Sequence, residues 1–318
     1  MTINMVRLLR DSRFAAYATT LVTLVCSACA PTHYVNNGTY LPADFSSINA
    51  KDARLFLRVA DNEIVQFKGT ATFDSIDAKH PAMMYGPGAA AAIIQLATQS
   101  TVVEISKGSQ KQRLQSEADT VLEPYQTVLS GYHYDTLVVT TLEKFAKSAS
   151  SFTIGKTTQR PDANWYIETT PVFSIAQDQN AIILENTISI YAPGSTQTPQ
   201  FQNIVKVVSS PIHTAEPTQF WTEDAGRQLK ETASTLFSDS LSIFLGQANE
   251  AYSDPNTPYR TFRYLEGTNE KIERAQLVAS SCDRLVVRTL RGYLLSFPAT
   301  QNSAKPHDNS HCAEKANS

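Results

Sequence analysis

Alternating apolar and polar residues predict three consecutive strands in the second half of the chain. The clearest run is Ile182–Tyr191, in which Ile, Leu and Asn at even positions alternate with Ile, Glu, Thr, Ser and Tyr at odd positions. This two-residue period is typical of a sheet with one covered face and one wetter face. Strands at Trp165–Ile175 and Phe201–Ser209 flank it, joined through Gln177–Asn180 and Ala192–Gly194. Such short connections predict an antiparallel meander.

A long amphipathic helix is expected after the meander, with Thr218 or Thr222 as its N-cap. Burial of each large apolar side chain contributes about 1.5 to 3 kcal/mol, so we expect this helix to cover the meander. Binding of a partner by the same face is the alternative. One broad face is apolar and the other mostly charged: Ala225, Leu229, Ala233, Leu236, Phe237, Leu241, Phe244, Leu245 and Ala248 against Glu223, Arg227, Lys230, Glu231 and Asp239.

Shorter elements surround this centre. Strands are expected at Ala53–Val59 and Ile64–Phe73, and a short helix from Asp135 to Ala146 with Asp135 as its N-cap, for which a strand is the alternative. The pattern predicts an α+β fold, an antiparallel β-meander covered by amphipathic helices, with a small C-terminal β region. The strands of that region are expected at Tyr259–Leu265, Ile272–Ser280, Arg284–Thr289 and Gly292–Phe297.

Arginines interleave with apolar residues in the C-terminal strands. We expect a solvated sheet face on which they pair with Glu266, Glu270 and Glu273. Binding of polyanions or glycans is the alternative for such a basic and aromatic set of strands. The arginines are Arg263, Arg274, Arg284, Arg288 and Arg291.

A second helical pattern runs from Ala89 to about Glu123, between Gly88 and Pro124. Its first half, Ala89–Ile105, is apolar on nearly all sides, which is typical of a helix buried in the protein or, less often, in a membrane. Its polar second half keeps one apolar face. Core packing is the plainest interpretation of the first half; membrane insertion and self-association are the alternatives. Gln95, Gln99 and Glu104 argue against a membrane span, because each would need a partner in hydrocarbon.

The first thirty residues follow another pattern. Arginines precede an apolar run, Phe14–Val25, which has the length of a signal-peptide core and is shorter than the roughly 20 residues that span a bilayer. The run is followed by Ser27-Ala28-Cys29, in which small residues stand directly before a cysteine. Two alternatives stay open. One is plain secretion with cleavage after Ala30, which would place Pro31 directly behind the scissile bond, a poor cleavage site. The other is a retained membrane anchor, for which the apolar run is short.

This segment resembles the lipobox of bacterial lipoproteins, in which the cysteine thiol takes a diacylglycerol. The chain departs from the family at Cys26, where Leu is usual. The resemblance implies that Cys29 is the lipidated N-terminus and that Ala30, which is not Asp, directs the protein to the outer membrane. The stretch Ala30–Ala50 is rich in Pro, Asn, Ser and Thr, and we interpret it as a tether.

The remaining cysteines fit an oxidising compartment. Cys282 and Cys312 would be the only thiols besides the lipidated one, and we expect them to form a disulfide. The two cysteines are 30 residues apart. Closing a loop of this length removes about 3 to 4 kcal/mol of chain entropy from the unfolded state. Two unpaired thiols are one alternative. A zinc site with His307, His311 and Cys312 is another, although the ligand spacing matches no common pattern.

Composition and spacing suggest five segments. Residues 1–28 are a signal peptide, 29–50 the lipidated N-terminus and tether, 51–255 the main α+β domain, 256–298 the C-terminal β region and 299–318 a polar tail. The formal net charge is −3 and no basic run is present, so nucleic acid is a poor candidate partner.

The sequence predicts no catalytic, cofactor-binding or metal-binding residue. It has no nucleophile elbow, no two Cys-x-x-Cys motifs that could act as a pair and no phosphate-binding glycine loop. The histidines are scattered, with His80, His133 and His213 near expected loops or element ends. These features favour a non-enzymatic outer-membrane lipoprotein that faces the periplasm and binds another envelope component, a protein partner above all. A carrier of lipid or another hydrophobic ligand and a hydrolase of envelope substrates are the alternatives.

Two further resemblances concern the body of the chain. The order of meander and amphipathic helix in Trp165–Ala248 behind a lipid tether is similar, at the level of fold, to auxiliary lipoproteins of lipid-transport complexes. Gly86–Leu122 resembles a segment of uncharacterised bacterial lipoproteins and implies no function.

Overall fold

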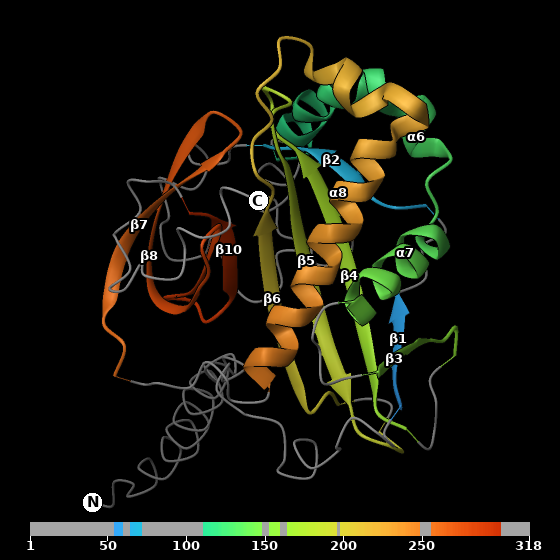
Figure 1. Cartoon of the computed structure of the whole chain (residues 1–318), viewed down its shortest axis with the longest axis vertical. Helices are drawn as coiled ribbons and strands as arrows, with labels where there is room; N and C mark the ends of the chain where they lie inside the picture. The colour runs from blue at the N-terminus through green and yellow to red at the C-terminus, as the bar shows by residue number, and fades with distance from the viewer. Residues whose placement is uncertain are drawn as a thin grey trace, which may run out of the picture. The chain divides into compact units, whose positions relative to one another are not determined.

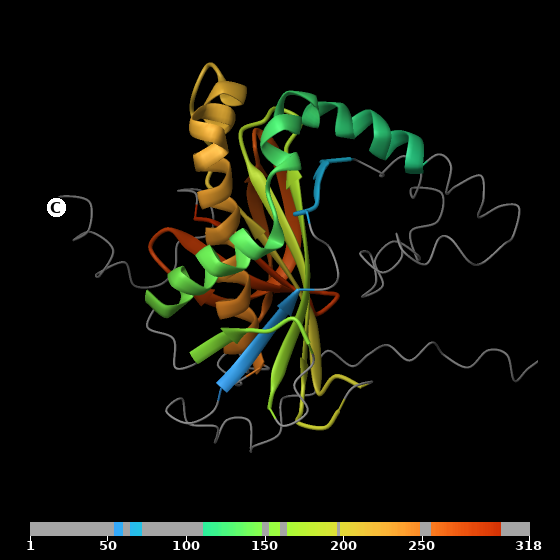
Figure 2. The same cartoon turned by 90° about the vertical axis from the view of Figure 1, so that its right-hand side faces the viewer.

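The computed structural model describes residues 54–59, 64–71, 111–147, 153–159, 164–195, 198–248 and 256–299. In these ranges one mixed sheet has the strand order β3-β1-β4-β5-β6-β10-β9-β8-β7, and β2 pairs with β4. Helices α7 and α8 lie on one face of the sheet, as Figures 1 and 2 show. The predicted α+β class is confirmed.

The centre of the sheet is the predicted antiparallel meander of β4 (Tyr166–Ile175), β5 (Ile182–Tyr191) and β6 (Phe201–Val208). The even-numbered residues of β5 are completely buried, from Ile182 to Ile190. Of the odd-numbered positions only Glu185 and Thr187 are partly exposed, whereas Ile183, Ser189 and Tyr191 are also buried. The two-residue period therefore predicted the strands and the fully buried face, but the opposite face is covered more than expected.

Parallel strands extend the sheet beyond β4. Strand β1 (Arg54–Val59) lies between β3 (Thr153–Lys156) and β4, and the short β2 (Phe67–Gly69) pairs with the end of β4. The prediction of one strand over Ile64–Phe73 was too long. The strand ends at Gly69 because the backbone groups of this residue bond to side chains. The Gly69 N–H donates to Asp119 Oδ1 at 2.7 Å, and the Gly69 carbonyl accepts from Gln115 Nε2 at 2.9 Å.

Helical segments follow β2 in the chain. Residues 111–118 are α-helical and continue into the 3₁₀ helix η2 (Asp119–Tyr125), α6 (Gln126–Ser130) and α7 (Tyr134–Lys147). The helical segment does not stop before Pro124, where the sequence predicted its end, because Pro124 is accommodated in the 3₁₀ helix η2. The helix predicted from Asp135 is present, but Asp135 is not its N-cap. Asp135 lies in the first turn, with Oδ1 2.5 Å from Lys156 Nζ.

Helix α8 (Pro217–Ala248) covers β5 and β6, as predicted, and its own side chains Phe237, Leu241 and Phe244 are fully buried. The helix is nevertheless interrupted. Glu223 is extended, and the next three residues have positive φ, ending with Gly226 at +78°. This kink was not predicted.

Two residues of α8 lie differently from the expected pattern. Ala225 was expected on the apolar face and is exposed instead, because it belongs to the kink. Asp239 was expected on the charged face and is half-buried, and this burial raises its pKa. A helical wheel assumes one unbroken axis, which the kink removes for residues 223–226.

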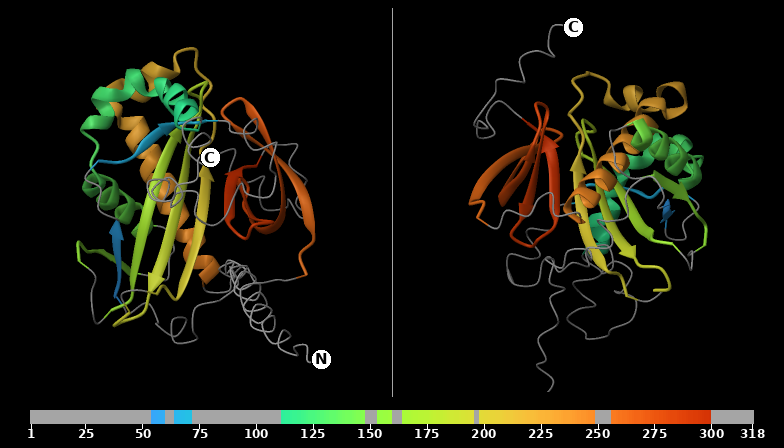
Figure 3. Two further views of the ribbon diagram at one scale, coloured as in Figure 1. Left: turned by 180° about the vertical axis from the view of Figure 1, so that it is seen from behind. Right: turned by 60° about the horizontal axis from the view of Figure 1, so that its bottom comes forward.

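The four C-terminal strands are β7 (Tyr259–Glu266), β8 (Asn269–Ser280), β9 (Arg284–Thr289) and β10 (Leu294–Pro298), close to the predicted ranges. Strand β10 pairs in parallel with β6, so the predicted boundary at residue 255 does not separate two sheets. Figure 3 shows these strands curving beside β6. A second apolar cluster contains residues of these strands, such as Phe262, Tyr264 and Phe297, together with Ile183 of β5.

Candidate functional site

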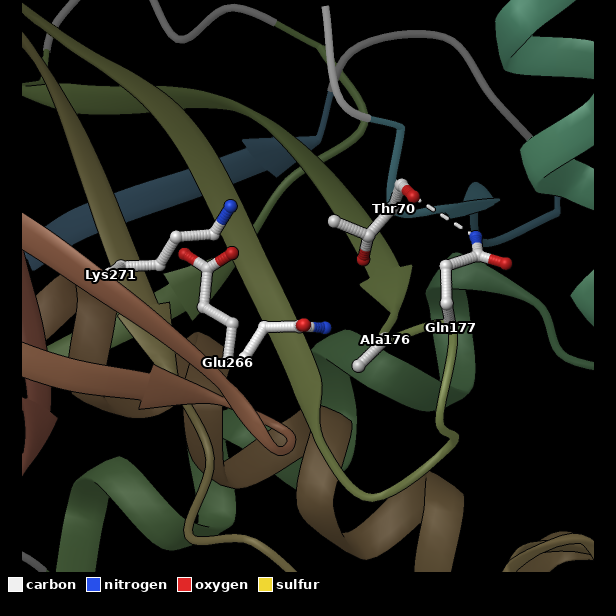
Figure 4. Close-up of a pocket in the computed structure, with 6 residues that line it drawn as sticks. Thr70, Ala176, Gln177, Glu266 and Lys271 are labelled. Atoms are coloured by element: carbon white, nitrogen blue, oxygen red, sulfur yellow. Dashed lines mark hydrogen bonds between the residues drawn. The ribbon is translucent and has the colours of Figure 1, made fainter. Parts of the chain in front are cut away.

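A polar cavity of about 100 Å³ lies between the β7–β8 hairpin and the ends of β2 and β4. Figure 4 shows Lys271 and Glu266 reaching in from the hairpin, with Thr70, Ala176 and Gln177 on the other side. Thr70 follows β2 directly, and Ala176 and Gln177 follow β4. Among the described residues, the lining consists of Thr70, Ala176, Gln177, Glu266, Asn269 and Lys271.

The hairpin turn is fixed against the turn that joins β4 to β5. Gly267 has φ +68°, and a Cβ at this position would lie 2.2 Å from Asp178 Oδ1, so only glycine permits this approach. The Asp178 carboxylate accepts hydrogen bonds from the backbone N–H and the hydroxyl of Thr268, and from the Asn180 N–H at 3.0 Å. These bonds hold one wall of the cavity to the other.

Protonation of Asp178 is expected to loosen this connection. Partial burial alone would raise the pKa of its carboxyl, but hydrogen bonds from Thr268 and Asn180 lower it below the ordinary value. A lowered pKa means that the carboxylate contributes stability above the unfolded pKa of about 3.9, and that this contribution is lost as pH falls through the lower folded value. We expect Asp178→Asn to cost about 1 kcal/mol at pH 7, because a neutral acceptor replaces a charged one that is screened by solvent.

Urea denaturation of both proteins between pH 2 and pH 7 measures this effect. The gap between the two stability curves should close below about pH 4. Parallel curves over the whole range would show that Asp178 is not linked to folding.

An ion pair crosses from the meander to the hairpin next to the cavity. Lys206 Nζ of β6 lies 2.6 Å from Glu266 Oε1, with side-chain exposures of 19% and 5%. The Tyr264 hydroxyl donates to the same oxygen at 3.2 Å. Burial alone would lower the pKa of Lys206, but the negative groups around it, among them Glu266 and Glu185, raise it instead. The Glu266 side chain is thereby held in place by Lys206 and Tyr264.

The groups that line the cavity differ in how far their bonding is satisfied. Gln177 Nε2 donates to the carbonyl oxygens of Thr70 at 3.0 Å and Ala118 at 3.1 Å, so the position of the side chain is fixed. Glu266 uses only Oε1 for its bonds to described residues. The Lys271 ammonium has no ion-pair partner in the described ranges. The cavity thus presents an anion and a cation with bonding capacity left over.

More titratable groups surround the ion pair. Glu273 of β8 and Tyr293, just before β10, both have raised pKa values because of burial. Glu185 lies directly opposite Lys206 in the register of β5 and β6. Charged and phenolic groups therefore occupy the space between the wetter face of the meander and the C-terminal strands.

The expected arginine pairs are present only in part. Arg263 donates to both carboxylate oxygens of Glu270 at 3.1 Å, as predicted. The expectation that Glu266 pairs with an arginine was wrong, because it turns inward to Lys206. The signal that marks this site in the sequence is Lys206 itself, a charged residue among the apolar positions of Phe201–Ser209.

The residues singled out in the sequence are not brought together in the structure. Cys29, Cys312 and His80 lie outside the described residues. Cys282 is exposed between β8 and β9, and because Cys312 lies outside the described residues, their pairing stays a prediction.

Other predicted features also stay untested. The apolar stretch Ala89–Ile105 and the tail after residue 299 lie outside the described residues. His133 and His213 are both exposed. Within the described ranges, His, Cys, Asp and Glu form no group able to hold a metal ion, and no helix is both long and apolar enough to cross a membrane.

Comparison of the chain with protein-family models, with curated proteins and with solved structures gave no match.

Proposed function

We propose that this chain is a lipid-anchored protein of the outer membrane that faces the periplasm and acts by binding another envelope component. The lipobox resemblance of Ser27-Ala28-Cys29 and the tether-like stretch Ala30–Ala50 support the location. The observation that carries the binding role is the cavity beneath the β7–β8 hairpin, where Lys271 and Glu266 retain bonding capacity toward one small space.

Binding fits the state of these groups better than catalysis does. Glu266 is held by Lys206 and by the hydroxyl of Tyr264. A general acid or base must be free to exchange a proton with its substrate, whereas a carboxylate fixed in an ion pair is suited to accept a hydrogen bond. The polar lining also favours a polar group over an acyl chain.

Replacement of Cys29 by Ser is expected to move most of the protein from the membrane fraction to the soluble periplasmic fraction. The serine hydroxyl cannot take the diacylglycerol, and the roughly 0.8 kcal/mol of membrane binding that each buried CH₂ contributes is then lost. Fractionation and mass spectrometry of the mature N-terminus measure both effects. Cys26→Ser, in the same segment, is the matched control and should stay in the membrane fraction.

Two results would contradict the proposal. One is an unmodified N-terminus on the mature protein, or equal membrane binding of Cys29→Ser. The other is hydrolysis of cell-wall or lipid substrates by the purified full chain. Crosslinking in intact envelopes, followed by capture of the full chain, tests the binding role directly. A component that is recovered with the native chain and lost with Lys271→Met would support it.

A further inference from the structure

Two opposite charges face the cavity, the Glu266 carboxylate and the Lys271 ammonium. Neither uses all of its hydrogen-bonding capacity on the described residues. The Glu266 side chain is 5% exposed, and Oε1 accepts both the Lys206 and the Tyr264 bonds, which leaves Oε2 without a donor among the described residues. Lys271 is half-buried on the adjacent strand, and none of the described residues forms an ion pair with its ammonium. Partly buried charges of this kind are costly unless something compensates them.

We propose that the cavity binds the α-amino carboxylate group of an amino acid. In this arrangement Lys271 donates to the ligand carboxylate, and Glu266 Oε2 accepts from the ligand ammonium. Asn269 also lines the cavity, and its side-chain amide can donate or accept. Both principal bonds are charge-assisted, which makes each about twice as strong as a neutral hydrogen bond.

The size and charge of the cavity select this class of ligand. A volume of about 100 Å³ corresponds to roughly three water molecules, far below the roughly 300 to 1,000 Å³ of sites for drug-sized ligands. It suits a small head group and not a whole large molecule. A neutral polyol would leave the Lys271 ammonium without a counter-charge, a simple anion would leave Glu266 Oε2 without a donor, and a simple cation would leave Lys271 without an acceptor.

This inference deepens the proposed function and rests on it only for the source of the ligand. An envelope protein meets α-amino carboxylate groups as free amino acids and at the ends of cell-wall peptides. Both carry the same chemistry, so the cavity alone does not distinguish between these two sources.

The test is an NMR titration of the ¹⁵N-labelled full chain in detergent with glycine, the smallest ligand of the class. Glycinamide lacks the carboxylate and acetate lacks the ammonium, so each probes one half of the recognition. We expect glycine to bind with an affinity of about millimolar and to shift amides at the hairpin turn. Glycinamide and acetate should bind about tenfold to a hundredfold more weakly.

Lys271→Met is the decisive variant, because the Lys271 ammonium forms no ion pair with any of the described residues that the substitution would break. It should weaken glycine binding about tenfold to a hundredfold and abolish the preference for glycine over glycinamide. Arg274→Met removes an equal charge from the exposed face of the same strand and should bind glycine as the native chain does. Equal binding of glycine and glycinamide by the native chain, or unchanged binding by Lys271→Met, would overturn the proposal, as would shifts with none of the three probes.

Competition then identifies the source of the ligand. Cell-wall peptides with a free α-amino carboxylate end that displace glycine would assign the cell wall, and displacement by free amino acids alone would assign those. The two proposals fail separately. If glycine binds through Lys271 while Cys29→Ser remains in the membrane fraction, the lipid anchor is wrong and the amino-acid site stands.

Discussion

Replacing Lys206 by Met is expected to lower the free energy of unfolding by about 3 kcal/mol, because Glu266 is left charged where water is nearly excluded. The two side chains are 19% and 5% exposed, and their charged atoms lie 2.6 Å apart. Tyr264 donates only one weak bond to the carboxylate, at 3.2 Å. A methionine fills the volume of the lysine stem but cannot compensate the charge.

The double variant Lys206→Met/Glu266→Gln separates this charge effect from lost packing. It removes the uncompensated carboxylate, so it should recover most of the stability that Lys206→Met loses. Urea denaturation at pH 7 gives the four free energies of the cycle. A double variant that loses as much as the sum of the two single changes would mean that the ion pair does not exist in solution.

The same pair predicts a change at high pH. Burial alone would lower the pKa of Lys206, but electrostatic interactions with Tyr264, Glu266 and Glu185 raise it above the ordinary value. A raised pKa means that the stabilisation is complete below the unfolded value of about 10.4 and is lost as pH rises through the higher folded value. The native chain should therefore lose stability in strong alkali more steeply than Lys206→Met does.

The central sheet could be predicted because its signal is local. Each strand of the meander alternates over many residues, and the turns Gln177–Asn180 and Ala192–Gly194 separate the strands. The covering helix followed from the apolar face that runs from Leu229 to Ala248. Pairing of β10 with β6 could not be predicted, because a parallel register depends on contacts about 90 residues apart rather than on a turn.

The cavity could not be predicted because its charges come from separate segments. Lys206 and Glu266 are joined only when the hairpin folds back over β6. Asn269 and Lys271 were missed for a smaller reason: the predicted strand began at Ile272, whereas Gly267-Thr268 forms a two-residue turn and β8 starts at Asn269. A glycine first in such a turn is a known hairpin signal, so these two residues could have been placed in the strand.

The kink in α8 was also marked in the sequence, by a glycine inside an apolar helical pattern. On the N-terminal side of the kink, the Trp221 indole donates to the Gln179 carbonyl at 2.7 Å, and the Thr218 hydroxyl donates to Gln179 Oε1 at 2.6 Å. Gln179 belongs to the turn that supplies Gln177 to the cavity lining and Asp178 to the contact with the hairpin turn. The change of direction at Gly226 therefore helps to position the candidate site.

Gly226→Ala is expected to lower the free energy of unfolding by about 2 to 4 kcal/mol, from strain at positive φ and from overpacking. Gly226 has φ +78°, and an added Cβ would lie 2.2 Å from Val128 Cγ1, in the buried face of α6. Denaturation by urea measures the loss. The variant should also exchange the amide hydrogens of the turn Gln177–Asn180 faster, because Trp221 no longer holds it firmly.

Two companion variants separate the causes. Adding Val128→Ala to Gly226→Ala removes the clash but not the strain, so the double variant should be more stable than the sum of the two single losses predicts. Ala225→Gly, at φ +56° in the same kink, should instead raise stability by about 0.5 to 1 kcal/mol, since glycine adopts this conformation without strain. If Gly226→Ala costs nothing, residues 223–226 are helical in solution, and the kink does not position the turn at the cavity.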